Sequence, residues 1–285
     1  MAAEPVGHRI TNRVVLWLLV VFFGLFCAFP FLWAGITMLK QNTDLYTRPN
    51  GNQLIFTKAP TLSNVTFLFD HTPFLTFIAN NVIVGMCVVL ITLALSVPAA
   101  YALARVTGRW GEKLGIGIFA VYLVPPTLLF LPLSQLVTLF GLQDSIWSLV
   151  IIYPSFTVPL STWLLMGFFK SIPRDIEEQA QVDGYSRLGA VLRAVVPLAL
   201  PGIFTVVVFT FTLTMQDLIY ALSFVSSSSR MTVSVGVPTN LVRGDVFYWQ
   251  SLMASAIVVA VPVALLYNLF LDKFIQGFTM SAAKG

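Results

Sequence analysis

Six long stretches without a charged side chain constrain this sequence more than any other feature. Each is longer than the ~20 apolar residues that a helix needs to cross ~30 Å of hydrocarbon. Charged residues make up only 10% of the chain, against about 25% in an average soluble protein. The sequence therefore predicts an all-α integral membrane protein with six transmembrane helices, at residues 14–39, 71–104, 114–143, 145–169, 194–216 and 246–271.

The distribution of lysine and arginine predicts how these spans are oriented, because cytoplasmic loops carry the excess of both residues. If the N-terminus is cytoplasmic, only five of the 16 basic residues fall on the outer side: Lys40, Arg48, Lys58, Arg230 and Arg243. We therefore expect two cytoplasmic ends, 1–13 and 273–285, on either side of one transmembrane domain at 14–272. Anionic lipid headgroups account for the net charge of +4 without any nucleic acid.

Several classes of function lack the residues that they need. The sequence has no G-x-x-x-x-G-K-[ST] phosphate loop, so the chain is not expected to bind ATP itself. His8 and His71 fall on opposite sides of the predicted membrane, and Cys27 and Cys87 lie inside predicted spans, where we expect them to pack as small apolar residues. No nucleophile and base stand at a known catalytic spacing. The sequence predicts no catalytic residue, no metal site and no cofactor in this chain.

Local signals predict where some elements begin, break or meet. Thr72-Pro73 is expected to cap and begin the second span, Pro125-Pro126 to break the third near its middle, and residues 62–69 to form a short helix. Asn80 and Asn81 are expected to form hydrogen bonds between helices. Tyr153 is expected to belong to the interfacial aromatic belt.

One charged segment, residues 173–202, separates the fourth and fifth predicted spans, with acidic residues in its first half and basic residues in its second. We expect Ser171 to cap a helix that starts at Pro173, and Gly184 to end it, since glycine takes positive φ without steric cost. A second helix should start near Ser186 and carry one apolar stripe at i, i+3, i+4 and i+7: Leu188, Val191, Leu192 and Val195. The pattern predicts a cytoplasmic helix–turn–helix, and an ordinary amphipathic interfacial hairpin fits it equally well.

The order of residues in this segment resembles the EAA loop of binding-protein-dependent ABC importers. The match reads Glu178-Gln179-Ala180, then Asp183-Gly184, then Val196-Pro197-Leu198. Residues 100–105 (AYALAR), 163–169 (WLLMGFF) and 277–285 resemble further parts of the carbohydrate-type branch, so the likeness extends from about Pro60 to the end of the chain. It is strongest to the smaller permease subunit of maltose-type importers.

The resemblance implies a transport path driven by other chains. In that family a cytoplasmic ATPase, which binds ATP and Mg²⁺, grips this loop, here residues 171–197. A second permease, two ATP-binding subunits and an extracytoplasmic solute-binding protein complete the importer, in a bacterial or archaeal plasma membrane. Gln179 departs from the alanine of the family motif, which should alter the fit to the ATPase. The docking residues that the resemblance implies are Glu178, Gln179, Ala180, Asp183, Gly184 and Arg187.

The solute is indicated by a second group of residues. Asp217 is the only acidic residue placed within an apolar span, and charged groups at membrane depth usually face a pore or a partner. We expect Gln216, Asp217 and Tyr220 to line the path, where they suit the hydroxyls and C–H faces of a sugar, oligosaccharide or polyol. Asp217 could instead pair with a neighbouring subunit. Met215-Gln216-Asp217 stands where the family commonly has Trp-Asn-Glu/Asp, a departure that leaves the transported molecule open. Glycerol or a glycerol phosphate is an alternative cargo.

Two alternatives do not need an ATPase. A self-contained secondary carrier normally shows inverted repeats and intramembrane coupling charges, and this sequence has no visible repeat and one intramembrane acid. A membrane-embedded enzyme or scaffold is disfavoured because no site for either is visible.

Overall fold

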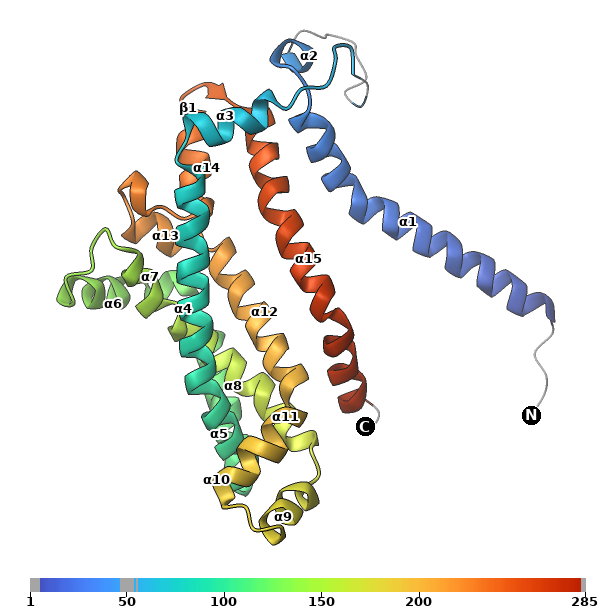
Figure 1. Cartoon of the computed structure of the whole chain (residues 1–285), viewed down its shortest axis with the longest axis vertical. Coiled ribbons are helices and arrows are strands. Elements are labelled where there is room, and N and C mark those ends of the chain that lie inside the picture. Colours follow the sequence, from blue (N-terminus) through green and yellow to red (C-terminus); the bar gives the residue numbers. More distant parts are fainter. Residues whose placement is uncertain (1–5, 47–53, 55, 283–285) are drawn as a thin grey trace. The chain divides into compact units, whose positions relative to one another are not determined.

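The structure is a computed structural model of the full chain, and it describes residues 6–46, 54 and 56–282. The described chain is almost entirely helical, with one short β-hairpin. It divides into two compact units, residues 1–72 with 240–261 and residues 73–239 with 262–285. Figure 1 shows the helices and strands of both units.

The first unit contains one long apolar helix and the short elements that follow it. Its elements are α1 (Val6–Met38), α2 (Asn42–Tyr46), α3 (Ser63–His71), β1 (Val242–Arg243), β2 (Val246–Phe247) and the beginning of α15 (Trp249–Ala282). The short helix predicted at 62–69 is confirmed as α3. The amide of Asn64 in α3 donates to the carbonyls of Met38 and Lys40 at 2.7 and 2.9 Å, which satisfies backbone acceptors at the end of α1. Cys27 in α1 is exposed. The expectation that it packs within this chain as a small apolar residue is therefore wrong.

The second unit is built around α4. Its elements are α4 (Phe74–Tyr101), a π-helical turn (Ala102–Val106), α5 (Arg109–Tyr122), α6 (Pro126–Leu139), α7 (Ile146–Ile152), α8 (Pro154–Ser171), α9 (Arg174–Val182), α10 (Arg187–Ala190), a second π-helical turn (Val191–Val195), α11 (Val196–Leu198), α12 (Leu200–Gln216), α13 (Ile219–Phe224), a 3₁₀ turn (Ser228–Arg230) and most of α14 (Val233–Leu241). Helix α4 packs against α8 and α12 (Figure 1). Small residues permit this packing: a Cβ on Gly85 would lie 2.7 Å from the ring of Phe211, and one on Gly202 would lie 2.5 Å from the ring of Phe168.

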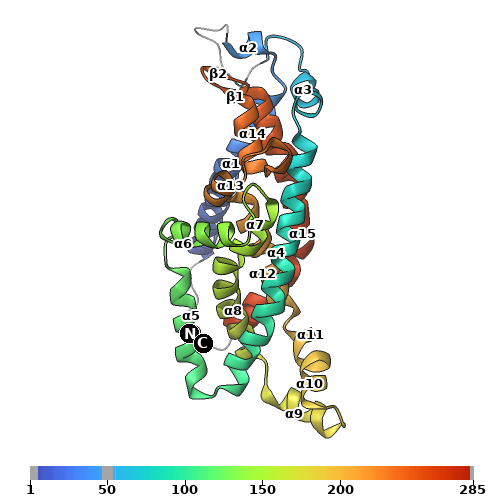
Figure 2. The ribbon, with the colours of Figure 1, turned by 90° about the vertical axis from the view of Figure 1, so that its left-hand side faces the viewer.

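Two of the predicted spans are not continuous helices. The described residues contain three helices long and apolar enough to cross a membrane, Arg13–Met38, Phe74–Val106 and Ile146–Ser171. Two further candidates are bent pairs, Arg109–Tyr122 with Thr127–Leu139 at 87° and Arg187–Leu198 with Leu200–Gln216 at 70°. Figure 2 shows α6 turning away from α5. The break predicted at Pro125-Pro126 is confirmed, and Pro197 and Pro201 flank the second bend, since proline lacks the N–H that a helix interior needs. Helix α15 contains a further apolar stretch, Trp249–Leu265.

Two predicted helix caps are wrong. The hydroxyl of Thr72 donates to the carbonyl of Leu68 at 2.6 Å, so it ends α3 and does not begin α4. The hydroxyl of Ser171 donates to the carbonyl of Phe168 at 2.8 Å, at the end of α8. Hydroxyls near a helix C-terminus reach the carbonyls three or four residues back, and here that local bond replaces the cap.

The two asparagines of α4 bind the backbone around the start of α14. Asn81 bonds to the first residue of α14, so its predicted bond between helices is confirmed, and Asn80 bonds to the 3₁₀ turn and the loop after it. Nδ2 of Asn80 donates to the carbonyls of Ser229 and Met231 at 3.1 and 2.9 Å, and Oδ1 of Asn81 accepts from the N–H of Val233 at 2.8 Å. The loop before α14 is therefore held against α4.

Candidate functional site

The charged segment forms a helical hairpin, as predicted. Helix α9 ends before Gly184, whose φ of +93° is the left-handed conformation expected of a glycine stop. Ser186 begins α10, because its Oγ accepts from the N–H of Gly189 at 3.2 Å. The hairpin lies at the end of α4 and α8 (Figures 1 and 2).

The predicted docking residues gather on this hairpin. Ala180 is buried at 9% exposure, so it faces the rest of the unit and supports α9 from beneath. The other five are exposed and available to a partner chain: Glu178, Gln179, Asp183, Gly184 and Arg187.

Sequence reasoning missed the residues that fasten the hairpin to α4. Glu177 is only 8% exposed, and its Oε1 accepts from the hydroxyl of Tyr101 at 2.5 Å. The guanidinium of Arg105 donates to the carbonyl of Ile172, just before α9. A signal for Glu177 exists, because it precedes the buried Ala180 by three residues and so lies on the same helical face.

The predicted apolar stripe of the second helix is only half covered. Val191 and Val195 are buried, at 9% and 0% exposure, whereas Leu188 and Leu192 are 68% and 57% exposed. The rest of the unit covers only one edge of the stripe and leaves its other edge open. The exposed leucines border a groove.

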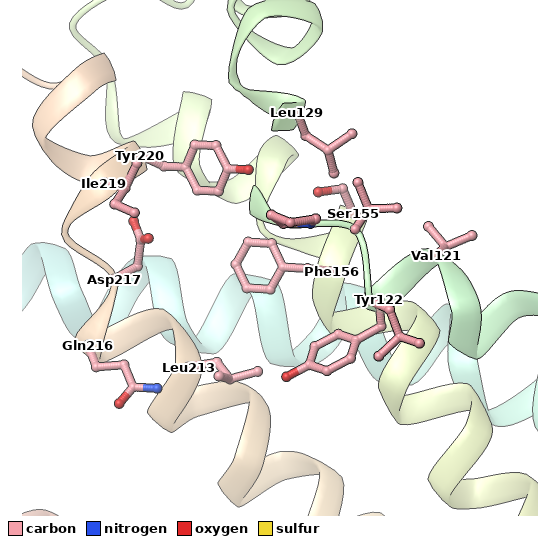
Figure 3. Close-up of a pocket in the computed structure, with 13 residues that line it drawn as sticks. Val121, Tyr122, Leu129, Ser155, Phe156, Leu213, Gln216, Asp217, Ile219 and Tyr220 are labelled. Atoms are coloured by element: carbon pink, nitrogen blue, oxygen red, sulfur yellow. The ribbon is translucent and has the colours of Figure 1, made fainter. Parts of the chain in front are cut away.

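The residues predicted to touch solute line one cavity. It has a volume of about 420 Å³ and lies where α5 gives way to α6 and α12 gives way to α13. Gln216, Asp217 and Tyr220 all contribute to its wall, as Figure 3 shows. Residues of both of these helix breaks line the cavity, and irregular backbone in membrane proteins is tolerated where it is buried in protein or lines a cavity.

Asp217 differs from expectation in its surroundings. It lies after the last residue of α12 and not within a helix, and its Oδ2 accepts from the hydroxyl of Tyr153 at 2.8 Å and from the N–H of Ala221 at 3.1 Å. The carboxylate therefore caps α13, a role that aspartate favours over a place in a helix interior. Tyr153 is fully buried, so its assignment to the interfacial belt was wrong.

Three further residues of the cavity were not singled out from the sequence. Tyr122 and Ser155 line it, and Oγ of Ser155 is buried without a hydrogen-bond partner in the described part of the chain. The ring of Phe156 stacks on that of Tyr220, with centroids 6.1 Å apart. The only sequence signal for this region is the neighbouring prolines, Pro125 and Pro154, which mark helix starts. Among the described residues, no group of three or more His, Cys, Asp or Glu side chains could hold a metal ion.

Comparison with known proteins identifies the family. The sequence model of the binding-protein-dependent transport system inner membrane component matches residues 93–279, which include the hairpin and the cavity. The chain belongs to this family. The permease is 35% identical, over 90% of its length and 89% of the relative's, to the sulfoquinovosyl glycerol transport system permease protein SmoH of Agrobacterium fabrum. It is 27% identical to the trehalose/maltose transport system permease protein MalG of Thermococcus litoralis, over 98% and 99% of the two chains.

The fold of the permease also has a solved counterpart. A chain of a bacterial ABC transporter involved in the import of the acidic polysaccharide alginate superimposes with a TM-score of 0.79 at 19% identity, over 96% of the permease and 100% of that chain. The permease is thus a multi-pass inner-membrane component of a transport system.

Proposed function

We propose that the permease forms part of the translocation path of an ATP-driven importer for a sugar, oligosaccharide or polyol. The observation that carries this proposal is the exposed hairpin, α9 to α10, fastened to the end of α4 by the Tyr101–Glu177 hydrogen bond. The printed names of its relatives, for sulfoquinovosyl glycerol and trehalose/maltose transport, support a carbohydrate cargo.

The proposed assembly follows that of an importer. A second permease completes the path, two ATP-binding subunits hold ATP and Mg²⁺, and an extracytoplasmic binding protein delivers the solute. With each bent pair counted as one span and α15 as another, the permease has six spans, and both ends, 1–13 and 273–285, are cytoplasmic around the membrane domain 14–272. This orientation places the hairpin, within residues 171–197, on the side of the ATPase.

The hairpin couples the motor to the path. Glu178, Gln179, Asp183, Gly184 and Arg187 contact the ATPase, and Ala180 positions them from the buried face. When ATP closes the motor subunits, the hairpin moves with them, and its bonds to α4 pass this motion to the spans. The path then opens outward, and hydrolysis resets it.

The cavity provides a place for the solute. The side chains of Gln216, Ser155 and Tyr122 offer polar groups, and the rings of Phe156 and Tyr220 offer apolar faces. Asp217 acts there as a positioning residue, since it holds Tyr153 and α13. The lining residues include an acid and no lysine or arginine, which disfavours glycerol phosphate as cargo.

Affinity purification from the native membrane, followed by mass spectrometry, tests the proposal. We expect the permease to bring down an ATPase, a second permease and a binding protein. Asp183→Lys should release the ATPase, whereas Asp245→Lys makes the same charge change at an exposed residue outside the hairpin and should retain it. Recovery of the permease alone, still transporting in liposomes without ATP, would contradict the proposal.

A further inference from the structure

A polar pocket of about 300 Å³ lies between the end of α4 and the hairpin. Its wall is formed by Arg105, Arg174, Glu177, Glu178, Gln181 and Arg187. Three guanidinium groups face two carboxylates there, so the pocket carries one positive charge in excess. In the described part of the chain, none of these arginines forms an ion pair within 4.0 Å. The pocket is therefore electrostatically suited to a singly charged anion.

Arg105 also lacks a hydrogen-bond acceptor for part of its guanidinium group. Its guanidinium donates to the carbonyl of Ile172, but its Nε is buried and has no acceptor among the described residues. Buried polar groups in native proteins nearly always have a partner. Glu177, in the same wall, accepts from the hydroxyl of Tyr101 and not from this Nε.

An apolar groove of about 460 Å³ adjoins this pocket. Arg187 lines both, so the two hollows share that side chain as a wall. The groove runs beside the last turns of α4 at Val97 and Pro98, and the exposed Leu188 and Leu192 form its opposite wall.

The groove lies alongside a membrane-spanning helix. The span that contains Val97 and Pro98 runs from Phe74 to Val106, and Arg105 stands at its end. The eight steps along the chain from Val97 to Arg105 correspond to about 12 Å along the helix axis. An occupant of both hollows therefore has a charged end near the end of this helix and an apolar end beside its preceding turns.

We propose that the pocket and the groove form one binding site for an anionic phospholipid. Its phosphodiester group, with one negative charge, lies among Arg105, Arg174 and Arg187, and an acyl chain occupies the groove. Basic pockets beside transmembrane helices suit such headgroups, and arginine matches phosphate oxygens with paired donors. A water-soluble ATPase would not reach the part of the groove that lies within the span. The site goes beyond the proposed function, because lipid binding needs neither ATP nor solute.

Native mass spectrometry of the intact transporter complex in detergent tests the site. The complex is incubated with dioleoyl phosphatidylglycerol or with dioleoyl phosphatidylcholine at equal concentration. We expect one phosphatidylglycerol per permease to be retained at least ~10-fold better than phosphatidylcholine, a difference equivalent to about 1.4 kcal/mol. Arg174→Gln and Leu192→Gln should each reduce this retention, and Arg174→Lys should largely preserve it.

Two matched variants serve as controls. Arg193→Gln and Val182→Gln change an exposed arginine and an exposed apolar residue of the same hairpin, and neither residue lines the pocket or the groove. Both should retain phosphatidylglycerol as the unaltered complex does. If the unaltered complex retains the two lipids equally, that result alone overturns the proposal, whatever the variants do.

The remaining outcomes separate other occupants. Displacement of the lipid by millimolar inorganic phosphate would show a simple anion site and contradict the acyl-chain assignment. A photo-crosslinking residue at position 192 should label lipid in native membranes. If it labels the ATPase or the second permease, the groove is a protein interface and the proposal is wrong.

Discussion

The hydroxyl of Tyr101 donates to Oε1 of Glu177 at 2.5 Å, and this bond joins the last turn of α4 to the first turn of α9. It connects the exposed hairpin to a membrane-spanning helix through two side chains. A partner that moves α9 thus acts on a buried carboxylate, and through it on α4. Several consequences of this and related contacts can be measured.

Tyr101→Phe should weaken the coupling between the hairpin and α4. The ring keeps its edge-on contact with Phe169, whose centroid lies 5.9 Å away, so only the hydroxyl is lost. A hydrogen bond to a charged group contributes about 1.5–3 kcal/mol, and we expect ATP-driven uptake in proteoliposomes to fall several-fold at an unchanged membrane level. Tyr185→Phe removes a hydroxyl from the exposed side of the same hairpin and should have little effect. Unaltered uptake in Tyr101→Phe would show that the bond does not transmit motion.

Gly184→Ala should strain the turn between α9 and α10. The φ of Gly184 is +93°, and nothing lies within 4 Å of a Cβ placed there, so the penalty comes from the backbone alone. A left-handed conformation costs an ordinary residue about 1–2 kcal/mol. We expect reduced copurification of the ATPase with normal membrane insertion. Gly167→Ala adds a methyl group to an equally open helical position and should leave copurification unchanged.

Local sequence signals were sufficient to predict the hairpin and the break at Pro125-Pro126. Gly184 and Ser186 determine a turn through their own backbone and side-chain preferences, and Pro125-Pro126 removes helical hydrogen bonds whatever surrounds it. Each of these effects acts within a few residues of its cause. The uncharged stretches likewise report helices that need an apolar environment, although their number does not distinguish a straight span from a bent one.

Contacts between distant residues could not be predicted in the same way. Glu177 and Tyr101 are 76 residues apart in sequence, and Asp217 and Tyr153 are 64 apart. From the sequence alone, Glu177 resembles any other acid in the first turn of a helix, and Asp217 resembles an intramembrane charge in need of a partner. Only the packing of α4, α8 and α12 shows which carboxylate is buried and which hydroxyl meets it.

The turn between α6 and α7 should hold the loop before α14 over a wide range of pH. Oδ1 of Asp144 accepts from the N–H groups of Ser226 and Ser227 at 2.9 and 2.8 Å, and Arg230 lies 3.9 Å from Oδ2. The hydroxyl of Ser227, with these N–H groups and Arg230, lowers the pKa of Asp144 to about 2. A carboxyl whose pKa is depressed on folding contributes stability above its unfolded pKa of 3.8 and loses it as pH falls towards 2.

The loop should therefore resist proteolysis equally at pH 7 and pH 5. Asp144→Asn removes the charge and should increase cleavage of the loop at pH 7 several-fold, measured by limited proteolysis of the purified complex. Asp70→Asn changes another exposed carboxyl, whose described surroundings show no hydrogen bond to it, and is the matched control. A loop that opens between pH 7 and pH 5 would contradict the assignment to Asp144.

Asp217 and Tyr153 should behave as a coupled pair, and Gln216 should not. Asp217→Leu leaves the buried hydroxyl of Tyr153 without its acceptor, which costs about 1–3 kcal/mol and lowers the Tm of the complex. Adding Tyr153→Phe removes the unpaired donor, so the double variant should be more stable than the sum of the single changes predicts.

Gln216→Leu instead alters an exposed side chain of the cavity wall and should raise the KM for uptake while leaving the Tm unchanged. If the effects of Asp217→Leu and Tyr153→Phe on stability are additive, the hydrogen bond between the two residues does not stabilise the cavity. The expectation that Asp217 contacts the solute directly would then be the better one.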